Sequence, residues 1–205
     1  MNKALSIISK LKRKLKHLLM PNTPTTLTPL EYARRIGVRI GEDNFIADNL
    51  CWSSEPYLIT IGSHCQISSG VRFLTHGGGQ VVRDEVPSFD TFGKIMVGDW
   101  VYLGTNSLIL PGITIENNVL VAAGAVVTKS IPSGVVCAGN PAKIICTVSE
   151  YFERNRVYNT ETKGLSWSAK KEVLLAINEA RFIKREYLTL NSKEETLSIK
   201  HGYTE

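Results

Sequence analysis

A six-residue period runs through the middle of this chain and limits the folds that it can adopt. Neither an amphipathic helix, with a period of about 3.6 residues, nor an alternating strand, with a period of about 2, explains a strict six. A unit this short cannot enclose a core alone, so successive units must stack to bury a continuous one. Branched aliphatic residues mark the period: Val97, Leu103, Ile109, Ile115, Val121 and Val127.

The other positions of each hexad agree with a stacked repeat rather than with a β-sandwich that has this spacing by chance. The residue after the aliphatic is often small, which suits a backbone packed close to its neighbour: Gly41, Ala47, Gly62, Gly98, Gly104 and Ala122. Two places later stand residues that tolerate positive φ, which predicts one corner per hexad: Asp43, Asn49, Gly70, Asn106, Gly112, Asn118 and Gly124. The fifth position is small or apolar, as at Cys65, Val71, Val101 and Ser107. The period starts at Ile40, is interrupted from Trp52 to Leu58 and resumes at Ile61.

A second interruption predicts a protruding loop over residues 77–94. Gly79, Glu85 and Thr91 occupy the places where aliphatic residues are expected. The 24 residues from Phe73 to Val97 are four whole hexads, so the phase of the repeat is kept. Loops of this length in compact domains are usually functional.

His76 stands where this loop begins, in the string Phe-Leu-Thr-His-Gly-Gly-Gly. A neutral imidazole is well matched to removing a proton from a hydroxyl near neutral pH. The three glycines that follow let the backbone approach a neighbour closely. The alternative is a histidine that only satisfies carbonyl groups at the base of a loop.

The first 35 residues are expected to form a basic helix and a linker. Residues 1–20 carry six basic residues and no acid, whereas the rest of the chain has 18 bases and 19 acids. Leucines at helical spacing predict a basic amphipathic helix over residues 3–19. This helix could lie on an anionic membrane surface or pack on protein. It has no uninterrupted apolar run, which excludes a membrane span and a signal peptide. Its basic face has no interleaved aromatic residues, which makes nucleic-acid binding a poor interpretation. The polar stretch Pro21–Pro29 is read as a connector without a helix.

The C-terminal segment, residues 148–205, is expected to be helical with a polar tail. Ser168 is the predicted cap of a helix that runs to about Tyr187. The four cysteines form neither a CxxC pair nor a Cys/His metal spacing, and Cys65 falls on a core position. A buried free thiol and a reducing cytoplasm are therefore expected, with no metal site.

The hexads resemble the hexapeptide-repeat acyltransferases, whose fold is a left-handed parallel β-helix. The resemblance covers roughly residues 36–145, and it implies a mainly β catalytic domain over residues 36–147 with a helical segment at each end. Three strings, VGDWVYLGTNSLILPGITI, AAGAVVTKSIP and AGNPAKII, are similar to the galactoside, maltose and xenobiotic acetyltransferases.

That resemblance implies a set of site residues and an assembly. His76 matches the general base, and acetyl-coenzyme A is expected in a groove between adjacent subunits of a homotrimer. The backbone around Thr105 and Ala123 would bind the pantetheine arm, and Lys129 and Lys143 would neutralise the coenzyme phosphates. No metal is required.

Two further residues are candidates for contact with the acceptor. Tyr102 stands where relatives commonly have tryptophan, which predicts a different acceptor pocket. Glu55, in Ser-Glu-Pro-Tyr-Leu-Ile, is the candidate for holding an acceptor hydroxyl or for orienting the imidazolium; the alternative is a plain exposed loop acid. Relatives with this stretch often have Asp after the histidine, but here that residue is Gly77.

The resemblance implies direct O-acetylation of a sugar hydroxyl. The expected setting is the biosynthesis of a surface polysaccharide or lipopolysaccharide precursor, by a cytoplasmic enzyme that residues 3–19 could hold at the inner membrane face. Two other acceptors stay open: an antibiotic such as chloramphenicol or a streptogramin, and an amino-sugar nucleotide acetylated on nitrogen. A non-catalytic scaffold and a three-histidine zinc enzyme are the weaker alternatives. An esterase is excluded because the chain has no GxSxG string.

Overall fold

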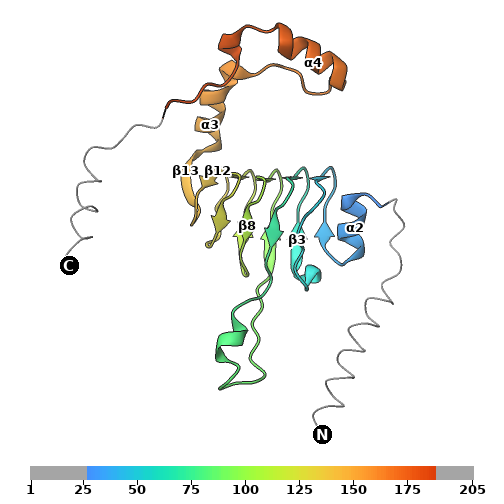
Figure 1. Cartoon of the computed structure of the whole chain (residues 1–205), viewed down its shortest axis with the longest axis vertical. Coiled ribbons are helices and arrows are strands. Elements are labelled where there is room, and N and C mark those ends of the chain that lie inside the picture. Colours follow the sequence, from blue (N-terminus) through green and yellow to red (C-terminus); the bar gives the residue numbers. More distant parts are fainter. Residues whose placement is uncertain (1–26, 188–205) are drawn as a thin grey trace, which may run out of the picture. The chain divides into compact units, whose positions relative to one another are not determined.

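The computed structural model describes residues 27–187, which form two compact units, one ending at Phe152 and the other starting at Glu153. The predicted amphipathic helix over residues 3–19 lies outside the described residues. Within residues 27–187, no helix is both long and apolar enough to cross a membrane. Figure 1 shows the first unit as short strands stacked along one direction.

Three sheets form the walls of the first unit. Wall A contains β1 (Arg39–Ile40), β3 (Ile59–Ile61), β6 (Ile95–Val97) and β9 (Thr114–Ile115). Wall B contains β2 (Phe45–Ile46), β4 (Gln66–Ile67), β7 (Tyr102–Leu103), β10 (Leu120–Val121), β12 (Val135–Ala138) and β13 (Lys143–Thr147). Wall C contains β5 (Arg72–Phe73), β8 (Leu108–Ile109) and β11 (Val126–Val127).

The chain visits walls A, B and C in turn, and strands within a wall pair in parallel, except that β13 returns antiparallel to β12. Met96 pairs with Thr114, Tyr102 with Leu120 and Leu108 with Val126, so one coil takes 18 residues, or three hexads. This three-sided arrangement of parallel sheets confirms the predicted left-handed β-helix.

The hexad aliphatics fill the interior of this prism. All six residues that defined the period are at most 4% exposed, and the fifth-position residues from Cys65 to Ala125 are buried as well. Every residue predicted at a corner has positive φ. His64 and Trp100 also adopt φ of 58° and 57° at corner positions, although their side chains are bulky for this conformation.

The small residue after each aliphatic allows the coils to stack closely. A Cβ on Gly62 would lie 2.7 Å from the carbonyl carbon and oxygen of Gly98 in the next coil. A Cβ on Gly104 would lie 2.4 Å from the amide nitrogen of Ala123. Glycine is therefore required at these positions because of the neighbouring backbone.

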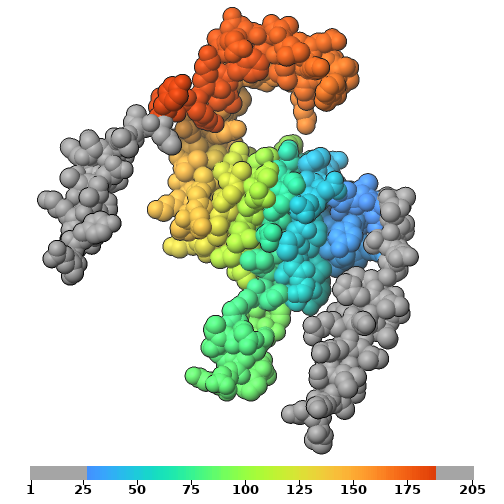
Figure 2. Space-filling model, in the orientation of Figure 1, coloured from blue at the N-terminus to red at the C-terminus, as the bar shows by residue number. Residues whose placement is uncertain are grey.

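Both interruptions of the period fall at one edge of the prism, where the chain passes from wall C to wall A; we call it the C–A edge. Ile40 pairs with Ile61 at a separation of 21 residues and Ile61 with Val97 at 36, against 18 in the later coils. The first passage thus gains three residues, with the 3₁₀ turn η1 (Pro56–Leu58), and the second gains eighteen, with η2 (Gly79–Val82). The longer insertion is the predicted loop, which projects from the body in Figure 2.

One detail at the N-terminal end of the β-helix differs from expectation. The helix α2 (Pro29–Arg35) begins at the last residue of the stretch that was expected to hold none. Thr28 and Glu31 form a capping box, and Pro29 takes the first helical position, which proline tolerates. After β13 come α3 (Val148–Asn155) and η3 (Arg156–Tyr158).

The C-terminal helix α4 (Trp167–Ala176) is capped by Ser166, not by Ser168, and it does not run to Tyr187. The Asn178 side chain accepts a hydrogen bond from the Ala180 amide and starts the separate turn η4 (Glu179–Arg181). This local bond competes with continuation of the helix, which explains the early end.

Candidate active site

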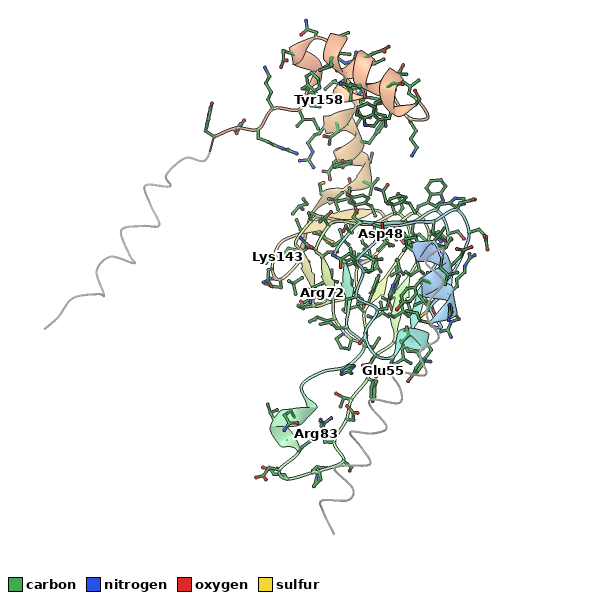
Figure 3. All side chains as sticks on the ribbon, turned by 45° about the vertical axis from the view of Figure 1, so that its right-hand side comes forward. Asp48, Glu55, Arg72, Arg83, Lys143 and Tyr158 are labelled. Carbon is green, nitrogen blue, oxygen red and sulfur yellow. The ribbon has the colours of Figure 1, made fainter. Side chains whose placement is uncertain are left out.

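Glu55 and His76 are brought together by the C–A edge. Each is the third residue after a core aromatic, Trp52 for Glu55 and Phe73 for His76. These two rings stack in adjacent coils with centroids 5.1 Å apart and planes within 3°. Glu55 and His76, each three residues further along the chain, therefore lie next to each other in adjacent coils. Figure 3 shows Glu55 at the base of the loop that carries Arg83.

The carboxylate of Glu55 contacts the imidazole of His76 directly. His76 Nδ1 lies 2.7 Å from Glu55 Oε2, and the side chains are 40% and 16% exposed respectively. An ionised carboxylate only accepts hydrogen bonds, so Nδ1 carries the proton. In the neutral ring this leaves the lone pair on Nε2, free to accept a proton from a substrate.

Two hydroxyl groups complete the cluster, and the sequence analysis identified neither. Thr75 Oγ1 lies 2.8 Å from Glu55 Oε2 and 2.8 Å from Ser53 Oγ. Ser53 Oγ accepts a 3.3 Å hydrogen bond from the Thr75 amide and is 3.5 Å from His76 Nδ1. The signal that could have found them is their position beside Glu55 and His76 at the two interruptions of the period.

The cluster stabilises the charged form of Glu55. Burial raises the pKa of this carboxyl, but hydrogen bonds from Thr75, Ser54 and His76, together with the charge of His76, outweigh burial and hold the pKa below its ordinary value. Glu55 is therefore ionised at neutral pH and is suited to stabilising a protonated His76.

Beside His76 is a hollow of about 430 Å³, lined by His76, Gly77, the loop residues Thr91–Gly93, and Leu110–Gly112 of the next coil. The Phe92 ring centroid lies 5.8 Å from that of His76. The Gly93 amide donates to the Thr75 carbonyl at 2.8 Å, which closes the base of the loop. The arrangement can hold a small acceptor next to the imidazole of His76.

The other predicted site residues are distributed over the prism. Thr105 and Ala123 lie together at the edge between walls B and C, where the Gly124 amide donates to the Thr105 carbonyl at 2.8 Å. Lys129 is exposed and follows β11, on the same C–A edge as His76. Tyr102 is 36% exposed on wall B, and Lys143 is exposed at the start of β13. One copy of the chain thus brings Glu55 to His76, and Thr105 to Ala123, but not these two pairs to each other.

The cysteines and potential metal ligands do not add to the site. All four cysteines are free, and Cys65 and Cys137 are buried; burial raises the pKa of Cys65 and takes that of Cys137 to about 11. Among residues 27–187, no group of three or more histidine, cysteine, aspartate or glutamate side chains could hold a metal ion.

Comparisons with known proteins agree with the fold. Residues 94–129 match the family model described as "Hexapeptide repeat of succinyl-transferase". The chain is 47% identical to protein CapG of Staphylococcus aureus over 146 residues, covering 69% of this chain and 84% of CapG.

The names of two further relatives state an acetyltransferase activity. The chain is 31% identical to the galactoside O-acetyltransferase of Escherichia coli, covering 63% of this chain and 66% of that enzyme. It is 31% identical to the hexapeptide-repeat acetyltransferase VCA0836 of Vibrio cholerae, solved in complex with acetyl-coenzyme A, with a TM-score of 0.50 over 54% of this chain and 60% of that one. The chain spans between about half and two thirds of the length of several other curated relatives.

Proposed function

Because this chain belongs to the hexapeptide-repeat acetyltransferase family, we propose that it transfers the acetyl group of acetyl-coenzyme A directly to a hydroxyl of a sugar, with His76 as the general base. The observation that carries this proposal is the 2.7 Å contact between His76 Nδ1 and Glu55 Oε2, which leaves Nε2 as the free acceptor. The galactoside enzyme supports oxygen as the acceptor atom.

The proposed reaction needs no acyl-enzyme. Acetyl-coenzyme A supplies the activated thioester carbonyl. His76 Nε2 takes the proton of the acceptor hydroxyl as that oxygen attacks, and the resulting imidazolium is stabilised by Glu55. The same proton can then pass to the leaving thiolate, so that the cycle ends with a neutral ring. Backbone N–H groups of the groove would stabilise the negative charge on the tetrahedral carbonyl oxygen.

The residues proposed to hold acetyl-coenzyme A are Thr105, Ala123, Lys129 and Lys143. Lys129 shares the C–A edge with His76, which suits a coenzyme lying along that edge. Thr105 and Ala123 lie at another edge, so a second copy of the chain is needed to bring their backbone near His76. We therefore propose a homotrimer with its sites between subunits. The VCA0836 complex with acetyl-coenzyme A supports the choice of donor.

We further propose that the acceptor is a sugar unit of a surface polysaccharide or lipopolysaccharide precursor. Such precursors are assembled at the inner face of a membrane, where the basic residues 3–19 would hold a cytoplasmic enzyme by electrostatic attraction. Tyr102 is the candidate for packing against the acceptor.

A thiol-release assay with acetyl-coenzyme A tests this function. The panel contains free sugars, nucleotide sugars with and without an amino group, chloramphenicol and a streptogramin, each run with wild type and His76→Ala. We expect release with a hydroxyl sugar and loss of release in the variant. Preferential release with the antibiotics or with the amino-sugar nucleotides would replace the proposed acceptor. No release with any compound, or undiminished release in His76→Ala, would contradict the proposal.

A further inference from the structure

The proton positions in the cluster follow from counting donors. The side chain of Thr75 is fully buried, and its hydroxyl lies 2.8 Å from two oxygen atoms, Glu55 Oε2 and Ser53 Oγ. A hydroxyl has a single proton, so it can donate to only one of them. An ionised carboxylate has none to give. The donor count therefore directs the proton of Thr75 to Glu55, and it leaves Ser53 as the only possible donor in the 2.8 Å contact between Ser53 Oγ and Thr75 Oγ1.

The chain of hydrogen bonds has a fixed direction. It begins at the Thr75 amide, which donates to Ser53 Oγ at 3.3 Å and cannot reverse. It passes through the two hydroxyls and ends on Glu55 Oε2, the same oxygen that accepts from His76 Nδ1. Each member thus determines the orientation of the next, as far as the imidazole ring.

The backbone of Ser53 gives a separate reason to assign it a role. Its φ is 61°, in the left-handed region that costs a side chain about 1 kcal/mol or more. Glycine would adopt this conformation without strain. What serine has and glycine lacks is the hydroxyl, and that hydroxyl bonds to Thr75.

We propose that Thr75 and Ser53 are positioning residues for the general base: their hydroxyls form a one-way hydrogen-bond chain that holds the Glu55 carboxylate with Oε2 against His76 Nδ1, and so keeps the proton of His76 on Nδ1 and its lone pair on Nε2. The catalytic consequence rests on the proposed function, whereas the position of the proton does not. The two can therefore be tested separately.

The direct test is the tautomer of His76 in the full chain. Long-range ¹H–¹⁵N correlation spectra of protein labelled in its histidines report which ring nitrogen carries the proton, and a His76→Asn sample identifies the signal. We expect Nδ1–H in wild type and Thr75→Ser, which keeps the hydroxyl, and a mixture or Nε2–H in Thr75→Val, which has a similar shape without it. Nε2–H in wild type, or identical spectra for Thr75→Ser and Thr75→Val, would overturn the proposal.

Ser53→Gly provides a second variant if Thr75→Val fails to fold. It removes the hydroxyl and suits the backbone. We expect a partial shift toward Nε2–H, because Thr75 then loses its contact with Ser53 and holds the Glu55 carboxylate less firmly. A spectrum unchanged from wild type would show that Ser53 does not direct the chain.

Turnover supplies the catalytic readout once the panel has provided an acceptor. We expect kcat to fall at least tenfold in Thr75→Val and about threefold in Ser53→Gly, with the KM for acetyl-coenzyme A within twofold of wild type. Thr75→Ser should recover most of the rate, and Thr114→Val, a matched change on the exposed face of wall A, should leave it unchanged. Equal losses in Thr75→Val and Thr75→Ser would contradict the role. Absence of activity in wild type would refute the proposed function and leave the tautomer measurement to decide this inference.

Discussion

Replacing Glu55 with glutamine separates charge stabilisation of the imidazolium from binding of the acceptor. The amide keeps the shape of the side chain, and its oxygen can still accept from His76 Nδ1, but the negative charge is gone. At the observed 2.7 Å, two unit charges attract each other by roughly 1.5 kcal/mol in bulk water and roughly 6 kcal/mol at an effective dielectric constant of about 20.

Since His76 is 40% exposed, solvent screens the pair and the lower part of this range applies. A hydrogen bond to a charged group contributes about 1.5–3 kcal/mol. Because the imidazolium exists only after proton transfer, this loss falls on the transition state, and kcat should drop about ten- to a hundredfold.

The assay is initial-rate thiol release with varied acceptor and saturating acetyl-coenzyme A, comparing wild type with Glu55→Gln. We expect the loss in kcat, with the acceptor KM within about twofold. If kcat stays unchanged and only the acceptor KM rises, Glu55 holds the acceptor hydroxyl and its charge does not stabilise the imidazolium. Circular dichroism of both proteins controls for folding.

Three further predictions concern stability. A Cβ at Gly62 would overlap the Gly98 backbone, so Gly62→Ala should lower the free energy of unfolding by about 1–3 kcal/mol. The control is Gly77→Ala, whose Cβ would meet no atom within 4 Å and whose φ is not left-handed; it should be neutral or stabilising by up to about 1 kcal/mol. Equal effects of the two substitutions in urea titrations would refute close stacking of the coils. The Ser107 hydroxyl is buried without a hydrogen-bond partner among the described residues, so Ser107→Ala should raise the free energy of unfolding by about 1 kcal/mol, and a destabilised variant would indicate a partner. Because folding lowers the pKa of Glu55, its charge stabilises the protein above pH 4.5, and this contribution is lost as the pH falls through the lowered pKa. The difference in free energy of unfolding between wild type and Glu55→Gln should therefore shrink below pH 4.5. A difference that grows there would contradict a lowered pKa.

The interior of the β-helix could be predicted because it depends on a single repeated distance. An aliphatic residue at every sixth place, such as Leu103 or Ile109, faces the same interior in every coil, so no distant contact has to be known. The corner residues follow from conformational preference at Asn106 and Asn118. That rule does not extend to His64 and Trp100, whose positive φ comes from the coil geometry and not from their own preferences.

The helices before and after the β-helix could be predicted less well, because several neighbouring residues are suitable as the first or capping residue of each helix. The capping box of Thr28 and Glu31 is visible in the sequence. The prolines before it favoured a connector without a helix, so the start of α2 was not predicted. Ser166 and Ser168 are both suitable caps, and only the structure decides between them.

His76 and Glu55 were selected as candidates from the sequence, but the contact between them was not predicted. The sequence did not show which residue orients His76, because Glu55 and His76 lie in two interruptions of the hexad period that differ in length. Counting three residues from Trp52 and from Phe73 would have superimposed them. Thr75 and Ser53 could not be identified in advance, since a hydroxyl is common and only its distances to Glu55 give it a role.

The central claim is that His76 is a general base facing acetyl-coenzyme A, and the His76→Ala variant tests it most directly. General-base catalysis contributes roughly 10²–10⁴-fold, so thiol release should fall by that factor. Calorimetric titration should show that the affinity for acetyl-coenzyme A stays within about twofold of wild type. Turnover that survives the substitution, with coenzyme binding intact, would contradict the account.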